Sequence, residues 1–206
     1  MMPLRIAIVG ERGSGKDTAG DFLVERFGCA KIALATPMKA SLSSGFAAFV
    51  ESCASSWKYR WIVPLLRRAI REKGIMRAPM QEAGLAMRRI DAEILARSLI
   101  ERHGLSCEEQ PTGYVVTDCR YLNECSALQH LGFTIVRIEA PAHIRKRRAM
   151  ARGDGSWRDA DALHDSEVEQ RKIKPDYVID NSTDDPAPMF AILNSIANDH
   201  VTRPAF

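Results

Sequence analysis

The sequence predicts an α/β fold built on a parallel β-sheet. Short apolar runs alternate with amphipathic stretches along the 206 residues, as in folds where crossover helices join parallel strands. A glycine-rich loop also follows the first apolar run, Ile6–Val9, and leads into an amphipathic stretch. We therefore expect one domain over residues 1–206, with five parallel strands and helices on both faces of the sheet.

Short apolar runs define the expected strands, which are 6–9, 31–35, 113–118, 133–138 and 177–181. Proline at the first position of a helix and glycine just past its end mark the expected helices. These are 22–27 before Gly28, a helix opened by Thr36–Pro37, 65–73 before Gly74, 79 to about 104, 122–131 before Gly132, a helix opened by Pro141, 162–172 and 186–198. Residues 43–62 show no clean period, and we assign no element to them.

The composition is that of an ordinary soluble chain, with 46% apolar residues, 27% charged residues and a formal charge of +3. This mild charge favours a small anionic ligand over nucleic acid, which would call for a concentrated basic face. The five cysteines form no C-x-x-C pair, which favours free thiols in a reducing compartment over structural zinc. We find no signal peptide and no run of membrane-spanning length. We expect a cytoplasmic protein without membrane contact, and the sequence leaves its oligomeric state open, a homodimer included.

The segment Gly10–Thr18 has the pattern of a phosphate-binding loop, G-x-x-x-x-G-K, between a strand and a helix. The glycines let consecutive N–H groups turn toward an anion, the next helix adds its positive end, and Lys16 adds a mobile charge. The residues expected to bind phosphates are Gly10, Arg12, Gly13, Ser14, Gly15, Lys16, Asp17 and Thr18. Asp17 stands where Ser or Thr is usual, and its carboxylate can hold Mg²⁺ directly or through water. A tight turn with a surface lysine is the alternative.

The expected helix from Pro79 carries two stripes. Its apolar positions at helical spacing form a core stripe, which is Met80, Ala83, Met87, Ile90, Ile94 and Leu99. Gln81, Gly84, Arg88 and Asp91 share another face. A glycine inside a helix costs about 1 kcal/mol against alanine, and close approach of a ligand is one reason to keep it. An ordinary polar face with a tolerated glycine is the alternative.

Charges at two other places suit an anionic ligand. Asp118 and Arg120 follow the third strand at its carboxyl end, where ligands bind in open α/β sheets. Alternatively, Asp118 caps the next helix and Arg120 pairs with Glu124. In the helix opened by Pro141, one face carries three guanidiniums, those of Arg145, Arg148 and Arg152. A solvated helix or a nucleic-acid patch are the competing interpretations of that face.

These segments resemble the bacteriophage-type deoxynucleoside monophosphate kinases, in the P-loop nucleoside monophosphate kinase family. The shared patterns are S-G-K-D-T at 14–18, A-x-P-M-K at 35–39, the spacing of Gln81, Gly84 and Arg88, D-x-R-x-x-N-E at 118–124 and H-x-S-E at 164–167. The loop is also similar to that of adenylate kinases, with Asp17 in a glycine's place, and animal-type phosphomevalonate kinases share S-G-K-D. Leu85 stands where the phage-type family tends to have threonine.

The resemblance implies a P-loop NTPase fold and transfer of the γ-phosphoryl group of ATP, with Mg²⁺, to a ribo- or deoxynucleoside monophosphate. It implies an acceptor-binding insert at about 37–104 and a segment at about 141–160 similar to a LID that closes over ATP. The implied roles are catalytic for Lys16, Asp118, Arg120 and Arg148, ATP-binding for the loop, Arg145 and Arg152, acceptor-binding for Lys39, Gln81, Gly84 and Arg88, and metal-binding for Asp17 or Asp118.

Other functions fit the same loop. A P-loop kinase can act on another small acceptor, such as phosphomevalonate, shikimate or dephospho-coenzyme A. A regulatory module that binds a nucleotide without turnover is a second alternative. Phosphoryl transfer that depends on one acceptor would distinguish a kinase from such a module, because a module would show at most slow ATP hydrolysis. The sequence names neither the base nor the sugar of the acceptor.

Overall fold

The computed structural model describes residues 3–55, 58, 60–64, 67–68, 73–103, 113–151 and 165–202. The chain divides into two compact units. The first comprises residues 1–34 and 96–206, and the second comprises residues 35–95. Among the described residues, no helix combines the length and the apolar character needed to cross a bilayer.

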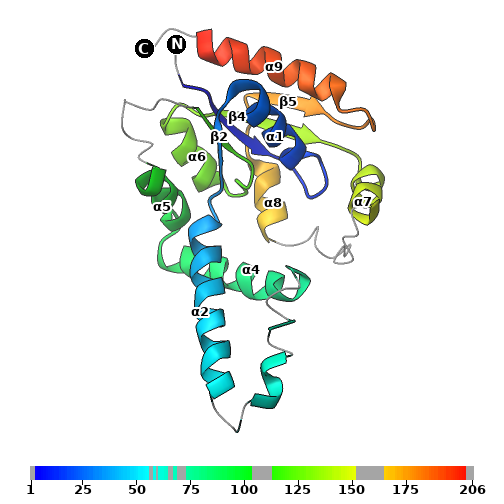
Figure 1. Ribbon diagram of the computed structural model, residues 1–206. Coiled ribbons are helices and arrows are strands. Elements are labelled where there is room, and N and C mark those ends of the chain that lie inside the picture. The colour runs from blue at the N-terminus through cyan, green and yellow to red at the C-terminus, as the bar shows by residue number, and fades with distance from the viewer. Residues whose placement is uncertain are drawn as a thin grey trace. The chain divides into compact units, whose positions relative to one another are not determined.

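A parallel sheet forms the centre of the first unit (Figure 1). Its strands are β1 (Arg5–Val9), β2 (Ala30–Ile32), β3 (Tyr114–Val116), β4 (Thr134–Glu139) and β5 (Tyr177–Asp180). They lie in the order β2-β3-β1-β4-β5, and each neighbouring pair is parallel. The predicted five-stranded parallel sheet is confirmed. Because β1 is the middle strand, the loop that follows it emerges between the carboxyl ends of β3 and β4.

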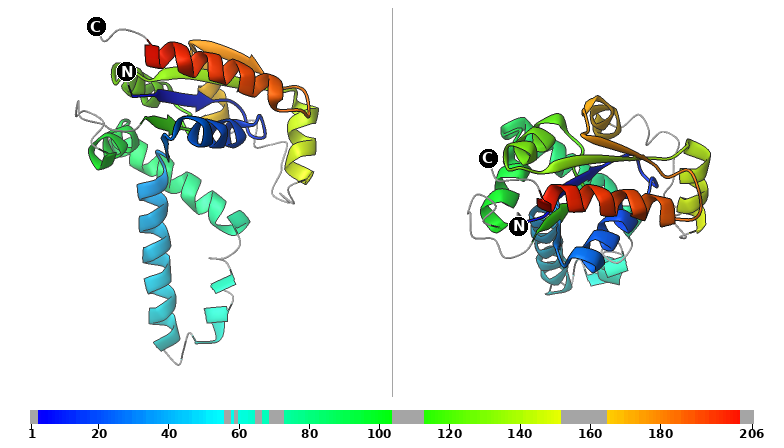
Figure 2. Two further views of the ribbon diagram at one scale, coloured as in Figure 1. Left: turned by 45° about the horizontal axis from the view of Figure 1, so that its top comes forward. Right: turned by 90° about the horizontal axis from the view of Figure 1, so that it is seen from above.

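Helices cover both faces of this sheet, as expected for a parallel sheet whose strands are apolar on both sides. They are α1 (Lys16–Phe27), α5 (Ile94–His103), α6 (Leu122–His130), α7 (Ala142–Ala151), α8 (Asp165–Lys172) and α9 (Ala187–Thr202). The view from above in Figure 2 shows α1 and α9 on one face and α6 and α8 on the other. Leu23 of α1 and Leu193 of α9 are fully buried against Ile8 and Val136 of the sheet in one apolar cluster.

Hydrogen bonds at the ends of these helices explain where they begin and end. Gly28 has φ +66° and donates its N–H to the Val24 carbonyl at 2.9 Å, which ends α1 as predicted. The Glu124 carboxylate accepts the N–H groups of Arg120 and Tyr121, at 2.9 and 3.2 Å, and so satisfies donors at the start of α6.

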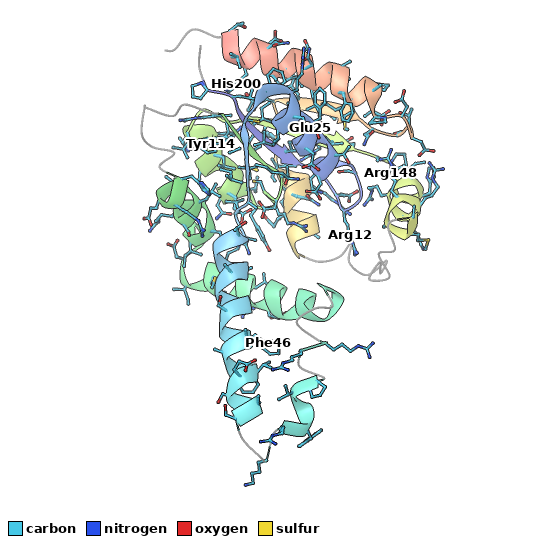
Figure 3. The ribbon with its side chains drawn as sticks, viewed as in Figure 1. Arg12, Glu25, Phe46, Tyr114, Arg148 and His200 are labelled. Atoms are coloured by element: carbon cyan, nitrogen blue, oxygen red, sulfur yellow. The ribbon has the colours of Figure 1, made fainter. Side chains whose placement is uncertain are left out.

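The last helix is tied to the start of the sheet through His200, which is labelled in Figure 3. The Nε2 atom of His200 accepts the backbone N–H of Arg5 at 3.3 Å, while its Nδ1 atom lies 2.9 Å from the Thr134 hydroxyl. An accepting Nε2 requires the proton on Nδ1, so the imidazole donates to Thr134. The end of α9 therefore holds the first residues of β1 and β4.

The second unit contains α2 (Thr36–Ser55), a 3₁₀ turn η1 (Arg60–Ile62) and α4 (Lys73–Ile90). Helix α2 begins at Thr36 as expected and continues through much of 43–62, where the sequence shows no clean period. Val50 and Cys53 of α2 pack with Val63 in a small buried cluster. Of the helix expected at 65–73, only Arg67, Arg68 and Lys73 lie within the described residues.

The prediction of a single helix from Pro79 to about 104 was wrong in three respects. Helix α4 begins at Lys73, so Gly74 lies inside it and does not end a helix. The helical run then ends at Ile90. The Asp91 carboxylate accepts the N–H of Glu93 at 2.9 Å, which forms a turn before α5 begins at Ile94. Ile90, predicted to lie in the core stripe, is 84% exposed at the end of α4.

Candidate functional site

At three glycines, the loop after β1 passes so close to other backbone or side-chain atoms that a side chain there would not fit. Gly10, Gly13 and Gly15 all have positive φ angles, of 146°, 83° and 109°. A Cβ atom on Gly10 would lie 2.3 Å from the Ile138 carbonyl oxygen, and one on Gly15 would lie 2.4 Å from the Asn181 amide nitrogen. Glycine at these positions is therefore required by both conformation and space.

Asn181, just after β5, fixes the loop from the side. Its amide donates to the Ser14 carbonyl at 2.8 Å, and the N–H of Ser14 donates to the Glu11 carbonyl at 3.1 Å. Ser14 is fully buried, and its hydroxyl has no hydrogen-bond partner among the described residues. A buried hydroxyl without a partner costs free energy, so a polar ligand at this loop would relieve it.

Lys16, the first residue of α1, folds back over the loop. Its ammonium donates to the carbonyls of Gly10 at 2.6 Å and Glu11 at 3.0 Å. Carbonyl oxygens carry partial negative charge, so an anion with full charge at the loop would attract the ammonium more strongly. The arrangement suits a lysine that moves onto a phosphate when the ligand arrives.

A cleft of about 480 Å³ opens beside the loop. Residues from the loop, from the ends of β4 and β5 and from α8 line the cleft. They include Gly10, Glu11, Ser14, Glu139, Arg171 and Asp180. The cleft thus lies at the carboxyl ends of parallel strands, next to the positive end of α1.

The arginines of α7 have separate partners. Arg145 donates through Nε to the Ala140 carbonyl at 3.0 Å and through Nη1 to the Arg12 carbonyl at 3.3 Å, and its Nη2 lies 2.5 Å from Glu11 Oε2. Arg148 donates instead to the carbonyl of Thr183, in the connection between β5 and α9. Figure 3 labels Arg12 on the loop and Arg148 on α7. Arg152 lies outside the described residues.

The Asp17 carboxylate points toward the end of β3. It accepts the Thr117 hydroxyl at 3.4 Å and lies 3.3 Å from the Lys31 ammonium, with 80% of its side chain exposed. Partial burial lowers the pKa of Lys31, but its hydrogen bond to Asp21 and the charge of Asp17 outweigh burial, so the pKa is raised. Lys31 therefore stays charged beside Asp17.

Asp118 and Arg120 border the same end of β3. Asp118 Oδ1 accepts the N–H of Leu34 at 2.8 Å, which ties the end of β2 to β3, and the N–H of Arg120 donates to Glu124. The cysteine between them is buried, with its Sγ 2.7 Å from that of Cys125. The hydrogen bond with Cys125 and burial raise the pKa of Cys119 well above its usual value. Its thiol is therefore not poised as a nucleophile.

The predicted acceptor-binding residues all belong to the second unit, with Lys39 on α2 and Gln81, Gly84 and Arg88 on α4. The side chains of Lys39 and Gln81 lie outside the described part of the chain. A Cβ on Gly84 would meet Arg88 Nη1 at 3.0 Å and Met38 Sδ at 3.6 Å. Packing of α2 against α4 is thus a second reason for the glycine.

The comparisons with known proteins agree with this geometry. Residues 5–63 match the family model described as deoxynucleotide monophosphate kinase. The matched segment contains β1, the loop, α1, β2 and α2, and the five-stranded parallel sheet around it has the α/β P-loop NTPase fold. A comparison with curated proteins found no match.

Three solved structures align with most of the chain, and the first of them has a TM-score above 0.5. The protein TT1252 from Thermus thermophilus has a TM-score of 0.52 and 20% identity, over 96% of this chain and 98% of that chain. Shikimate kinase from Acinetobacter baumannii in complex with shikimate has a TM-score of 0.48 and 14% identity, over 97% and 94%. APS kinase from Mycobacterium tuberculosis has a TM-score of 0.45 and 14% identity, over 98% and 99%.

Sequence reasoning missed four residues around the loop and its cleft. Asn181 holds Ser14 across 167 positions, and Glu11 contacts Arg171 across 160 positions. The fourth, Arg137 of β4, donates to the carbonyls of Gln170 and Ile173 at 2.8 and 2.6 Å and so fixes the end of α8. The one available signal in the sequence was the arginine at position 137 within an otherwise apolar strand, because a buried charge needs partners.

We expect Gly10→Ala to weaken ATP binding by about tenfold or more, because a positive φ costs an L-residue roughly 1–2 kcal/mol and the Cβ would strike backbone. Gly45→Ala is the matched control, since Gly45 lies in α2 with nothing within 4 Å of a Cβ. It should stabilise the fold by about 0.5–1 kcal/mol and leave ATP affinity unchanged. Calorimetry measures the ATP affinity, and urea unfolding measures the stability of the fold. Equal ATP affinity in Gly10→Ala would contradict the loop geometry.

Proposed function

We propose that the chain transfers the γ-phosphoryl group of ATP to a deoxynucleoside monophosphate and releases ADP and the deoxynucleoside diphosphate. The match of residues 5–63 to the deoxynucleotide monophosphate kinase family carries this proposal. The contacts of the loop support the proposal. Gly10 and Gly15 leave space only for backbone, and the Lys16 ammonium donates hydrogen bonds to the loop's own carbonyls. Such a loop supplies N–H donors and a mobile charge to phosphates.

Arginines of the first unit are proposed to offset the charge of the transferred group. Arg171 lines the cleft beside Gly10 and Ser14, and Arg145 lies against the loop from the first turns of α7. Arg120 and Arg148 also remain in the proposal, although Arg148 would have to exchange the Thr183 carbonyl for a phosphate oxygen. Guanidinium groups suit this role because they bind phosphate oxygens in pairs and stay charged.

Mg²⁺ is proposed to be held by Asp17, with Asp118 as the other candidate. The oxygen donors present fit this ion in kind, because Mg²⁺ prefers carboxylates and water, and the Asp17 carboxylate is 80% exposed beside the Thr117 hydroxyl. Within the described ranges no group of three His, Cys, Asp or Glu gathers around a point. Few protein ligands are expected for an ion that is bound jointly by the protein and the substrate phosphates. The ion would neutralise the charge of these phosphates during transfer.

We expect Asp17→Asn to raise the Mg²⁺ concentration needed for half-maximal activity by about tenfold, since a neutral amide binds the ion less well than a carboxylate. Binding of ATP in the absence of metal should change by less than about threefold. Asp21→Asn is the control, because Asp21 also contacts Lys31 but lies a turn further along α1. An unchanged magnesium titration in Asp17→Asn would exclude Asp17 as a metal ligand.

An acceptor screen tests the function directly. We expect ADP formation to depend on at least one deoxynucleoside monophosphate when the full set of ribo- and deoxynucleoside monophosphates is offered with Mg²⁺-ATP. Lys16→Ala should reduce this turnover by about two decades or more with the fold intact, because Lys16 lies at the loop and not in the core. If no nucleotide is phosphorylated and another phosphorylated metabolite is, the acceptor assignment fails and a P-loop kinase of different specificity stands.

The acceptor phosphate is proposed to be held by Arg88 of α4. We expect Arg88→Lys to lower acceptor kcat/KM by about one to two decades, because lysine cannot reproduce a two-donor contact worth roughly 1.5–3 kcal/mol. The KM for ATP should stay within about twofold. The adjacent and exposed Arg89 gives the control Arg89→Lys, which should leave both constants unchanged. A parallel rise in the ATP KM would show that Arg88 does not discriminate between the two substrates.

A further inference from the structure

Glu11, a variable position of the phosphate-binding loop, gathers two guanidiniums from two different helices. Arg145 of α7 lies 2.5 Å from Oε2, while Arg171 of α8 donates to Oε1 through Nε at 3.0 Å and through Nη2 at 2.7 Å. One carboxylate thus joins the loop to both helices. These three side chains together carry a net charge of +1 beside the loop.

The two arginines are held to different extents. Only 12% of the Arg145 side chain is exposed, and its remaining donors are engaged by the carbonyls of Ala140 and Arg12. Arg145 therefore keeps the Glu11 carboxylate in place. Because Glu11 is only 27% exposed, its charge is screened less than that of a fully exposed pair.

Arg171 depends on Glu11 for its orientation. Its side chain is 53% exposed, and within the described ranges of the chain its hydrogen bonds are those of Nε and Nη2 to Glu11. The backbone of α8 is fixed independently, since Arg137 binds the carbonyls of Gln170 and Ile173. A long side chain on a fixed helix would sample many rotamers without a partner, and Glu11 selects the one that faces the cleft.

We propose that Glu11 is a positioning residue that holds Arg171 over the phosphate-binding loop before ATP arrives. The inference rests on the proposed function only in that ATP binds at this loop. Arg171 then meets the phosphates through its Nη1 donors without first losing rotamer freedom, so its contribution to binding is larger when Glu11 is present. Competition between Glu11 and phosphate for Arg171 would have the opposite consequence, since removal of Glu11 would then increase that contribution.

The sign of the coupling between the two residues is therefore the test. Dissociation constants of Mg²⁺-ATP and of inorganic tripolyphosphate are measured by calorimetry for the full-length protein, Glu11→Gln, Arg171→Ala and the double variant. We expect Arg171→Ala to weaken binding about tenfold when Glu11 is present. In the Glu11→Gln background it should weaken binding only about twofold, so the coupling is about fivefold.

Three controls separate positioning from a structural role. Glu11→Asp keeps the charge on a shorter side chain and should restore part of the coupling. Asp184→Asn removes an exposed carboxylate that pairs with Arg147 of α7, and it should leave both dissociation constants unchanged. Thermal unfolding of each variant reports whether the fold is lost. If Glu11→Gln and Glu11→Asp both lose the fold, the measurement uses Arg171→Lys instead, because this variant keeps the charge but not the two-donor contact.

Each outcome decides the inference. A larger effect of Arg171→Ala when Glu11 is present supports it, whereas additive effects or coupling of the opposite sign overturn it. No acceptor is needed, so this failure is distinct from failure of the proposed function. If the protein binds ATP and shows the coupling but phosphorylates no nucleotide, only the proposed acceptor is rejected. If it binds neither ligand, the inference and the proposed function are both rejected.

Discussion

The close approach of Gly10 to the Ile138 carbonyl is the constraint on which the rest of the site depends. With 2.3 Å between that oxygen and the position of a Cβ, the loop can pass over the end of β4 only as bare backbone. This passage places Glu11 within reach of α7 and α8, and it places Ser14 against Asn181 after β5. The arrangement of charges around the cleft thus follows from one steric condition at the end of β1.

The sheet and the loop could be predicted because their signals are local. Ile6–Val9 is apolar in every position, as a central parallel strand must be, and the glycines at 10, 13 and 15 all have the positive φ angles that glycine accommodates. Helix ends at Gly28 and Gly132 followed from the same conformational preference. In these stretches the residues that decide the structure are neighbours in the chain.

The errors arose where two local signals conflict or where the decisive partner is distant. Gly74 and Pro79 each indicate a boundary, yet both lie within α4. Asp91 forms a side-chain turn between α4 and α5, although its spacing from Arg88 is that of a continuous helix face. Glu11 occupies a position that the loop pattern leaves unspecified, and its partner Arg171 is 160 residues away. Long-range ion pairs of this kind depend on how helices pack on the sheet, which no short window of sequence contains.

The hydrogen bond from Asn181 to Ser14 also bears on the order of events during synthesis. The side chain of Asn181 that holds the loop is made 167 residues after Ser14. Until β5 adds to the sheet beside β4, the loop lacks this contact, and until α9 forms, β1 lacks the cover of Leu193 and Met189. Nascent chains that end before these two elements therefore lack part of the support of the loop, because domains fold as units once their last segments emerge. A ligand that binds only the folded loop can stabilise the molecule only after β5 and α9 have been made.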